Sequence, residues 1–221
     1  MPRTALLFDL DGTMLHTDPI HYAIFVEWMA ERGVAVDEAF YATHVHGRVT
    51  SDVFAEFLPG ERDPHALADA KEAEFRRRLP SPYPAMAGLH ALLDRVQAAG
   101  HPLAVVTNAN PLNAEAMLAA IGERARFDVV ISGEECAAGK PDPAPYRAAM
   151  DRLGVAPAAC IAFEDSPSGI RSARDAGARV IGIRSSLDHA ALIAAGAHAS
   201  IDDFNDPALD EHLARPEGVF P

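Results

Sequence analysis

The sequence predicts an α/β protein with a doubly wound parallel sheet and an inserted α-helical unit. Two observations predict this architecture. Short apolar runs alternate with helical patterns at the start of the chain and again after residue 84, as in a parallel sheet covered on both faces. Between these regions, residues 15–84 contain no comparable strand. We therefore expect a core of residues 1–14 and 85–221 and a helical cap domain of residues 15–84.

The core is expected to contain five buried strands. Each is a short apolar run, partly of β-branched residues, and helical patterns separate them. One such pattern has leucines at positions 89, 92 and 93 and ends near Gly100. The five predicted strands are residues 5–8, 103–106, 129–131, 161–163 and 180–183.

The inserted segment has the pattern of a small helical domain. Asp18-Pro19 resembles an N-cap followed by a proline at the first helical position, and apolar residues at helical spacing continue until Gly33. Asp63-Pro64 repeats this start signal. Two shorter helices are expected near residues 37–44 and 51–58. The expected core residues of this domain include Trp28, Phe54 and Phe57.

The two connections between these regions differ in stiffness. Leu15-His16-Thr17 is short, whereas the proline-rich segment of residues 80–84 is stiff and extended. Because the chain enters and leaves the helical domain through two neighbouring linkers, we expect a hinge. The helical domain would then close over the core and exclude water.

The composition excludes several classes of partner. The chain has 221 residues, 49% of them hydrophobic, and a net charge of −13, which disfavours binding to nucleic acid or to anionic membranes. No apolar stretch approaches the ~20 residues of a membrane span, and the first residues do not resemble a secretory signal. We expect a cytoplasmic protein, a monomer or weak homodimer, with Cys136 and Cys160 as unpaired buried thiols.

Two carboxylates follow the first predicted strand, in the segment Asp9-Leu10-Asp11-Gly12-Thr13. They stand where the chain turns at Gly12, at the carboxyl edge of the sheet, and open α/β sheets build their ligand sites at this edge. One carboxylate can bind a cation or attack an electrophile while its neighbour transfers protons.

Polar residues also follow the second strand and precede the fourth. Thr107-Asn108 stands before a helix that starts near Pro111, and a hydroxyl at a helix N-terminus suits a phosphate group. A simple N-cap is the alternative interpretation. The prolines after Lys140 keep this residue out of a helix, so that it can neutralise an anion or pair with a carboxylate.

Acidic residues follow the fourth strand in Glu164-Asp165-Ser166. Together with Asp9 and a carbonyl group of the first loop, they would supply the oxygen ligands that Mg²⁺ prefers. Helix capping by Asp165 or Ser166 is a second role for this segment, and the two roles are compatible.

The segment around Asp9, together with Thr107, Lys140 and Glu164-Asp165, resembles the four motifs of the haloacid dehalogenase superfamily, in order and over nearly the whole chain. The resemblance implies a Rossmann-like catalytic core. The helical insertion resembles the superfamily's cap of the first type, as in phosphoglycolate phosphatases, fructose-1-phosphate phosphatases and β-phosphoglucomutases. Asp18-Pro19 and His21 match residues that recur in this group.

The resemblance implies catalytic roles for two carboxylates and three phosphate-binding groups. Asp9 would be the nucleophile that forms an aspartyl-phosphate. Asp11 would protonate the leaving oxygen and then take a proton from the hydrolytic water. Thr107 and the backbone N–H of Asn108 would hold the phosphoryl oxygens, and Lys140 would balance the charge on Asp9 and on the phosphoryl group.

The same resemblance implies Mg²⁺ as the cofactor. Asp165 and Glu164 would hold the ion, with a carboxylate oxygen from Asp9 and the backbone carbonyl of Asp11. The candidate substrate contacts from the cap domain are His21, Gly47 and Arg48.

Two departures from the β-phosphoglucomutase pattern favour a phosphatase over a mutase. β-Phosphoglucomutases carry a Ser-Lys-Asn type of segment where this chain has Ala109-Asn110-Pro111, and a cap arginine where it has Thr50. Both changes remove cations that would grip a second phosphate. We therefore expect a Mg²⁺-dependent phosphatase for a small phosphorylated metabolite, a sugar phosphate or phosphoglycolate. A β-phosphoglucomutase-type hexose phosphomutase is the alternative enzyme, and a phospho-acceptor signalling module is the non-enzymatic alternative.

Overall fold

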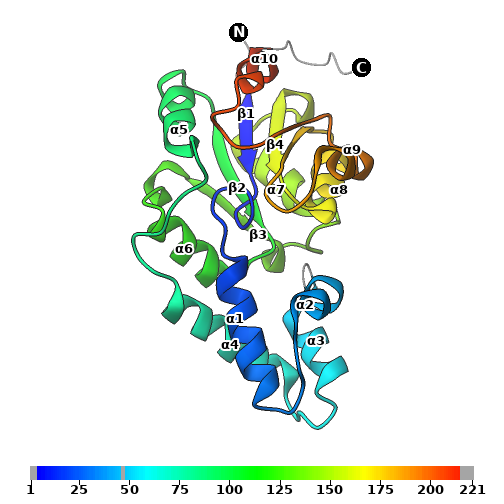
Figure 1. The fold of residues 1–221 in the computed structure, drawn as a ribbon. Coiled ribbons are helices and arrows are strands. Elements are labelled where there is room, and N and C mark those ends of the chain that lie inside the picture. Colours follow the sequence, from blue (N-terminus) through cyan, green and yellow to red (C-terminus); the bar gives the residue numbers. More distant parts are fainter. Residues whose placement is uncertain (1–3, 46–47, 215–221) are drawn as a thin grey trace. The chain divides into compact units, whose positions relative to one another are not determined.

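The computed structural model describes residues 4–45 and 48–214 (Figure 1). The chain divides into two compact units, Met1–His16 with Ser81–Pro221, and Thr17–Pro80. The first unit contains the sheet, and the described part of the second unit contains helices and loops (Figure 1). We call them the core unit and the cap unit.

The core unit is built on a six-stranded sheet with the strand order β3-β2-β1-β4-β5-β6, in which all neighbours are parallel. The strands are β1 (Ala5–Phe8), β2 (Leu103–Thr107), β3 (Val129–Ser132), β4 (Cys160–Glu164), β5 (Arg179–Ile183) and β6 (Ala199–Ile201). The five predicted strands are confirmed. β6 was not predicted, because it has only three residues and just one of them, Ile201, is buried.

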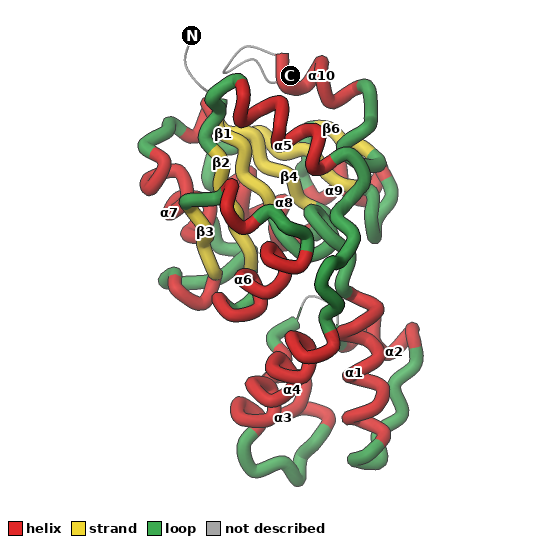
Figure 2. The backbone as a smooth tube through the Cα atoms, turned by 90° about the vertical axis from the view of Figure 1, so that its left-hand side faces the viewer, coloured by secondary structure: helices red, strands yellow, loops and turns green. Residues whose placement is uncertain are grey.

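Helices pack on both faces of this sheet (Figure 2). Alternate residues of β1 point to opposite faces. Leu7 belongs to the cluster that includes Tyr146 and Ile170, whereas the Phe8 ring stacks on Phe163 at a centroid distance of 4.9 Å. The helices of the core unit are α5 (Leu89–Ala98), α6 (Pro111–Ala120), α7 (Ala144–Leu153), α8 (Pro167–Asp175), α9 (His189–Ala195) and α10 (Ala208–Ala214), with short 3₁₀ turns at Arg124–Arg126, Gly133–Glu135 and Pro157–Ala159.

The cap unit contains α1 (Asp18–Ala30), α2 (Glu38–His44), α3 (Thr50–Phe57) and α4 (Pro64–Arg78). The predicted start of α4 is confirmed, since the Asp63 carboxylate accepts a hydrogen bond from the Ala66 N–H at 2.9 Å. The predicted cap of α1 is wrong by one residue. Asp18 lies inside the first turn, where its charge suits the positive end of the helix dipole. Helix α1 also ends at Ala30, before Gly33.

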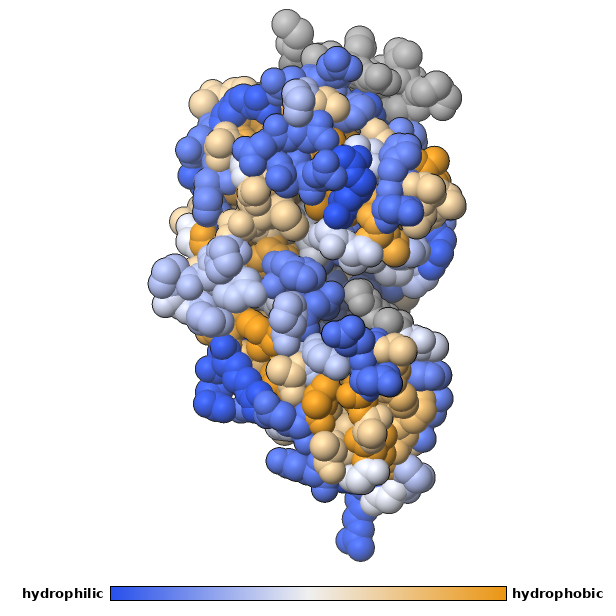
Figure 3. Space-filling model, in the orientation of Figure 1, coloured by the Kyte–Doolittle hydropathy of each residue, from blue (hydrophilic) through white to orange (hydrophobic). Residues whose placement is uncertain are grey.

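The core of the cap unit is only partly as predicted. Phe54 is buried together with Phe25 and Met29, but Trp28 and Phe57 are half-buried. The Trp28 ring is covered instead by the Arg32 guanidinium, whose carbon lies 5.7 Å from the ring centroid. Figure 3 shows apolar side chains gathered on the surface of this unit, as expected for a small unit with a limited interior.

The two linker ends are bonded to each other within the core unit. Leu15 forms a β-bridge with Ala85, and the Met86 N–H donates to the Met14 carbonyl at 2.7 Å. The Tyr83 hydroxyl donates to the His16 carbonyl at 2.7 Å. These contacts fix where the chain leaves the core unit, and the hinge itself stays a prediction.

Two further predictions concern the cysteines and the membrane. Cys136 and Cys160, both in the described part of the chain, are free thiols; Cys160 is buried as expected, but Cys136 is only half-buried. None of the helices within residues 4–45 and 48–214 combines the length and the apolar character needed to cross a bilayer.

Candidate active site

The predicted site residues of the core unit meet at the carboxyl edge of the sheet. Asp9 directly follows β1, Thr107 ends β2, and Glu164 ends β4. Because β1 pairs with β2 on one side and with β4 on the other, these three strand ends lie next to one another. The strand order therefore brings together residues that are more than 150 positions apart.

Lys140 stands at the centre of this group. Its Nζ donates to Asp9 Oδ1 at 2.5 Å, to Glu164 Oε1 at 2.5 Å and to the Val106 carbonyl at 2.7 Å. These contacts use the three N–H donors of the ammonium group. Burial opposes the charge of Lys140, but the two carboxylates outweigh it and raise the pKa above its usual value. Lys140 is therefore a fixed positive charge beside Asp9.

The side chain of Asn108 holds the Lys140 backbone in place. Its Oδ1 accepts from the Lys140 N–H at 2.9 Å, and its Nδ2 donates to the Lys140 carbonyl at 3.1 Å. Two glycines make room for this amide, because a Cβ atom at Gly133 or Gly139 would lie 2.4 or 2.8 Å from Asn108 Oδ1. This clamp was not predicted, because only the backbone N–H of Asn108 was expected to act in the site.

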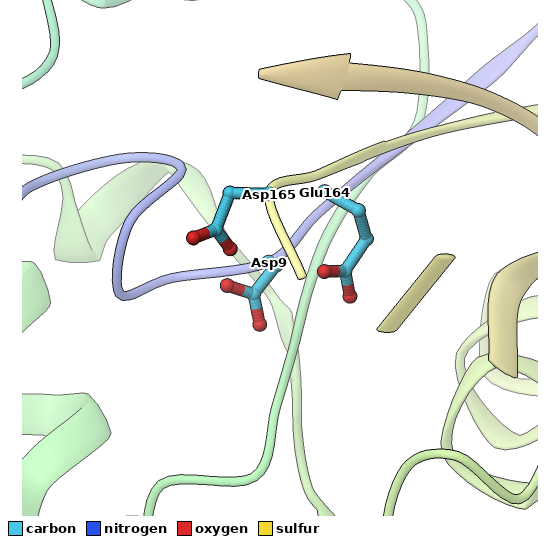
Figure 4. A group of neighbouring side chains, drawn as sticks. All are labelled: Asp9, Glu164 and Asp165. Atoms are coloured by element: carbon cyan, nitrogen blue, oxygen red, sulfur yellow. The ribbon is translucent and has the colours of Figure 1, made fainter. Parts of the chain in front are cut away.

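Three buried carboxylates form a cluster that could hold a metal ion. Asp9, Glu164 and Asp165 each offer one oxygen atom, and the three atoms lie within 4.8 Å of one another (Figure 4). Burial raises the pKa of Asp165 well above its usual value, and the neighbouring carboxylates of Asp9 and Glu164 raise it further. Burial also raises the pKa of Glu164, to about 7.

The donor set fits a hard divalent cation. Oxygen ligands and uncompensated negative charge are what Mg²⁺ requires, and a bound cation would favour the ionised form of all three groups. Two residues that were not predicted from the sequence support this cluster. The hydroxyls of Ser185 and Ser186 each donate to Asp165 Oδ2 at 3.4 Å.

The two helices that begin near the site, α6 and α8, are capped by Asn110 and Ser166 and not by Thr107, Asn108 or Asp165. Asn110 caps α6 by accepting from the Asn113 N–H, so the interpretation of Thr107-Asn108 as a simple N-cap is wrong. Ser166 caps α8 by accepting from the Gly169 N–H at 3.1 Å. Both Thr107 and Asp165 therefore remain available to the site.

Asp11 and Thr107 complete the core part of the site. Burial raises the pKa values of Asp9 and Asp165, and the charge of Asp11, two residues after Asp9 in the same turn, raises both further. The Thr107 hydroxyl accepts from the Ala109 N–H at 3.0 Å, and its own proton can be donated to a ligand.

The three candidate contacts from the cap unit stay predictions. The His21 ring stacks on Phe75 at a centroid distance of 4.0 Å, and its Nδ1 accepts from Lys71 Nζ at 2.6 Å. Arg48 pairs with Glu56 at 2.8 Å. Gly47 lies outside the described residues.

A doubly wound sheet whose carboxyl edge holds a lysine among buried carboxylates defines an α/β enzyme with its active site at that edge. Residues 6–183 match the family model of the haloacid dehalogenase-like hydrolases, and the chain belongs to this family. The resemblance seen in the motifs is confirmed.

Two relatives and one solved structure illustrate the similarity. The chain is 34% identical to fructose-1-phosphate phosphatase of Escherichia coli (strain K12), over 81% of this chain and 95% of the relative. It is 34% identical to phosphoglycolate phosphatase of Rhodospirillum rubrum, over 98% of this chain and 93% of the relative. The structure of a family IA hydrolase from Entamoeba histolytica superposes with a TM-score of 0.85 and 27% identity, covering 95% of this chain and 97% of that chain.

Proposed function

We propose that this hydrolase removes the phosphoryl group from a small phosphorylated metabolite, a sugar phosphate or phosphoglycolate, with Mg²⁺ as cofactor. The observation that carries the proposal is the contact of Lys140 Nζ with Asp9 Oδ1 at 2.5 Å, beside the oxygens of Glu164 and Asp165. The relatives named as fructose-1-phosphate and phosphoglycolate phosphatases support this substrate class.

The arrangement addresses the main obstacle to this reaction, which is the repulsion between a carboxylate and an anionic phosphate. Lys140 neutralises part of that charge next to Asp9. Asp9, Glu164 and Asp165, with the backbone carbonyl of Asp11, would hold Mg²⁺. When bound, the ion supplies positive charge at the phosphoryl group and orients it.

Catalysis would proceed in two displacements at phosphorus. In the first, a carboxylate oxygen of Asp9 forms a bond to phosphorus while the ester bond breaks, and Asp11 gives its proton to the leaving oxygen. In the second, Asp11 takes a proton from a water molecule that attacks phosphorus, which releases inorganic phosphate and restores Asp9. The Thr107 hydroxyl and the Asn108 N–H would hold phosphoryl oxygens throughout.

The test is a screen of phosphorylated metabolites, including fructose 1-phosphate and phosphoglycolate, with inorganic phosphate release as the readout. We expect release with Mg²⁺, loss of release after chelation with EDTA, and recovery when Mg²⁺ is restored. Release of phosphate that is unaffected by EDTA would contradict the metal site. No release from any compound of the panel would contradict the substrate class.

One additional reaction separates the phosphatase from a mutase. β-Glucose 1-phosphate is supplied with a hexose bisphosphate activator, and glucose 6-phosphate is measured alongside inorganic phosphate. We expect inorganic phosphate and no 6-phosphate. Formation of the 6-phosphate as the main product would replace the proposed hydrolysis by phosphoryl transfer between two sugar hydroxyls.

A further inference from the structure

Tyr146 contacts the carboxylate cluster from helix α7. The residue is fully buried, and its hydroxyl donates a hydrogen bond to Glu164 Oε1 at 2.7 Å. Tyr146 follows Lys140 by six residues, so one short segment supplies both the ammonium group and this hydroxyl. The sequence suggests no such role, because an aromatic residue at this place in a helix has the pattern of a core position.

The hydroxyl of Tyr146 and the ammonium group of Lys140 share one acceptor. Glu164 Oε1 accepts from Lys140 Nζ at 2.5 Å and from the Tyr146 hydroxyl at 2.7 Å. The Lys140 Nζ atom also lies 5.2 Å from the centroid of the Tyr146 ring. Two donors on the same oxygen fix both the position and the direction of the carboxylate.

The backbone of α8 also packs against the Glu164 carboxylate. A Cβ atom built on Gly169 would lie 2.0 Å from Glu164 Oε2 and 2.1 Å from Oε1. The carboxylate therefore packs directly on the Gly169 backbone, and a side chain larger than glycine's at this position would displace it.

We propose that Tyr146 is a positioning residue of the metal site, which acts by holding Glu164 in the orientation that presents it to the ion together with Asp9 and Asp165. The inference rests on the proposed function, since it requires that this cluster binds Mg²⁺. Hydrogen-bond partners of metal ligands act in this way, and their loss typically lowers metal affinity 10–100-fold.

The variant Tyr146→Phe tests this role because it removes one oxygen atom and keeps the ring. We expect the dissociation constant for Mg²⁺, measured by titration calorimetry on the whole protein, to rise by about tenfold or more. The Mg²⁺ concentration for half-maximal phosphate release should rise in parallel, with KM for the phosphorylated substrate little changed at saturating Mg²⁺. The control Tyr22→Phe makes the same atomic change on the cap unit and should leave Mg²⁺ binding unchanged.

A double-mutant cycle separates positioning from a purely structural role. If Tyr146 acts through Glu164, Tyr146→Phe should cause no additional loss of Mg²⁺ affinity in a Glu164→Gln background. Wild-type affinity in the single variant would overturn the inference, even if its melting temperature fell. Equal losses in both backgrounds would overturn it as well.

The outcome for the wild-type protein distinguishes this inference from the proposed function. If the wild type neither binds Mg²⁺ nor needs it for phosphate release, the proposed function fails and the inference fails with it. If the wild type behaves as proposed and Tyr146→Phe matches it, only the role of Tyr146 is overturned.

Discussion

Gly12 packs directly against the carboxylate of Asp165. A Cβ atom on Gly12 would lie 2.2 Å from Asp165 Oδ2, and the φ angle of Gly12 is +82°. Glycine is therefore required here for two reasons, because the turn needs a left-handed backbone conformation and because the carboxylate needs the space. The turn after the first strand and the acidic segment after the fourth are thus parts of one structure.

The variant Gly12→Ala should lose more Mg²⁺ affinity and activity than its loss of folding stability can explain. The left-handed backbone alone costs about 1–2 kcal/mol for a residue with a Cβ atom, and the Cβ would also displace Asp165. Gly122→Ala is a matched control, because Gly122 has a φ of +78° and a Cβ there would meet no atom within 4 Å. We expect both variants to lose stability in urea denaturation, and only Gly12→Ala to lose Mg²⁺ affinity and phosphate release. Equal Mg²⁺ affinity in the two variants would show that the contact is irrelevant.

The variant Asp9→Asn should abolish phosphate release and leave the fold intact. The amide cannot act as the nucleophile, and loss of a nucleophile costs far more than about a thousandfold in kcat. The fold should persist because the amide oxygen can still accept from Lys140. Stopped-flow detection of phosphate measures the first effect, and circular dichroism with urea denaturation measures the second. Substantial residual release would remove the covalent mechanism.

The variant Lys140→Met should be both inactive and unstable. It removes the cation between Asp9 and Glu164 and leaves two buried carboxylates without their partner, which typically costs about 3–5 kcal/mol. We expect Mg²⁺ to raise the melting temperature more in this variant than in the wild type, since the ion relieves the same repulsion. A stability equal to that of the wild type in EDTA would mean that Lys140 does not balance these charges.

The sequence could predict where the strands end but not which side chains support the site. Three of the predicted strands run directly into polar residues of the site, so Asp9, Thr107 and Glu164 could be assigned to one edge of the sheet. The clamp of Asn108 on Lys140 joins segments 32 positions apart, and no local pattern encodes it. The glycines at 133, 139 and 169 were the available signal, because each leaves space for a side chain of the site.

The contact of His21 with the buried Lys71 should make the cap unit sensitive to acid. Burial lowers the pKa of His21 well below its usual 6.5, and the nearby Lys71 ammonium group lowers it further. The folded state therefore resists protonation of His21, whereas the unfolded chain takes up a proton below about pH 6.5. The contribution of His21 to the free energy of unfolding is therefore fully present above that pH. It decreases as the pH falls, by at most about 1.4 kcal/mol per pH unit.

Urea denaturation between pH 7.5 and 5 measures this effect when the wild type is compared with His21→Gln. The variant loses the ring stacked on Phe75 and should be less stable at pH 7.5. The difference between the two proteins should then shrink as the pH falls, because only the wild type has an imidazole beside Lys71 that must stay neutral. His65→Gln, at an exposed position of α4, is the control and should follow the wild-type curve. A constant difference between wild type and His21→Gln across this range would show that His21 titrates alike in the folded and unfolded states.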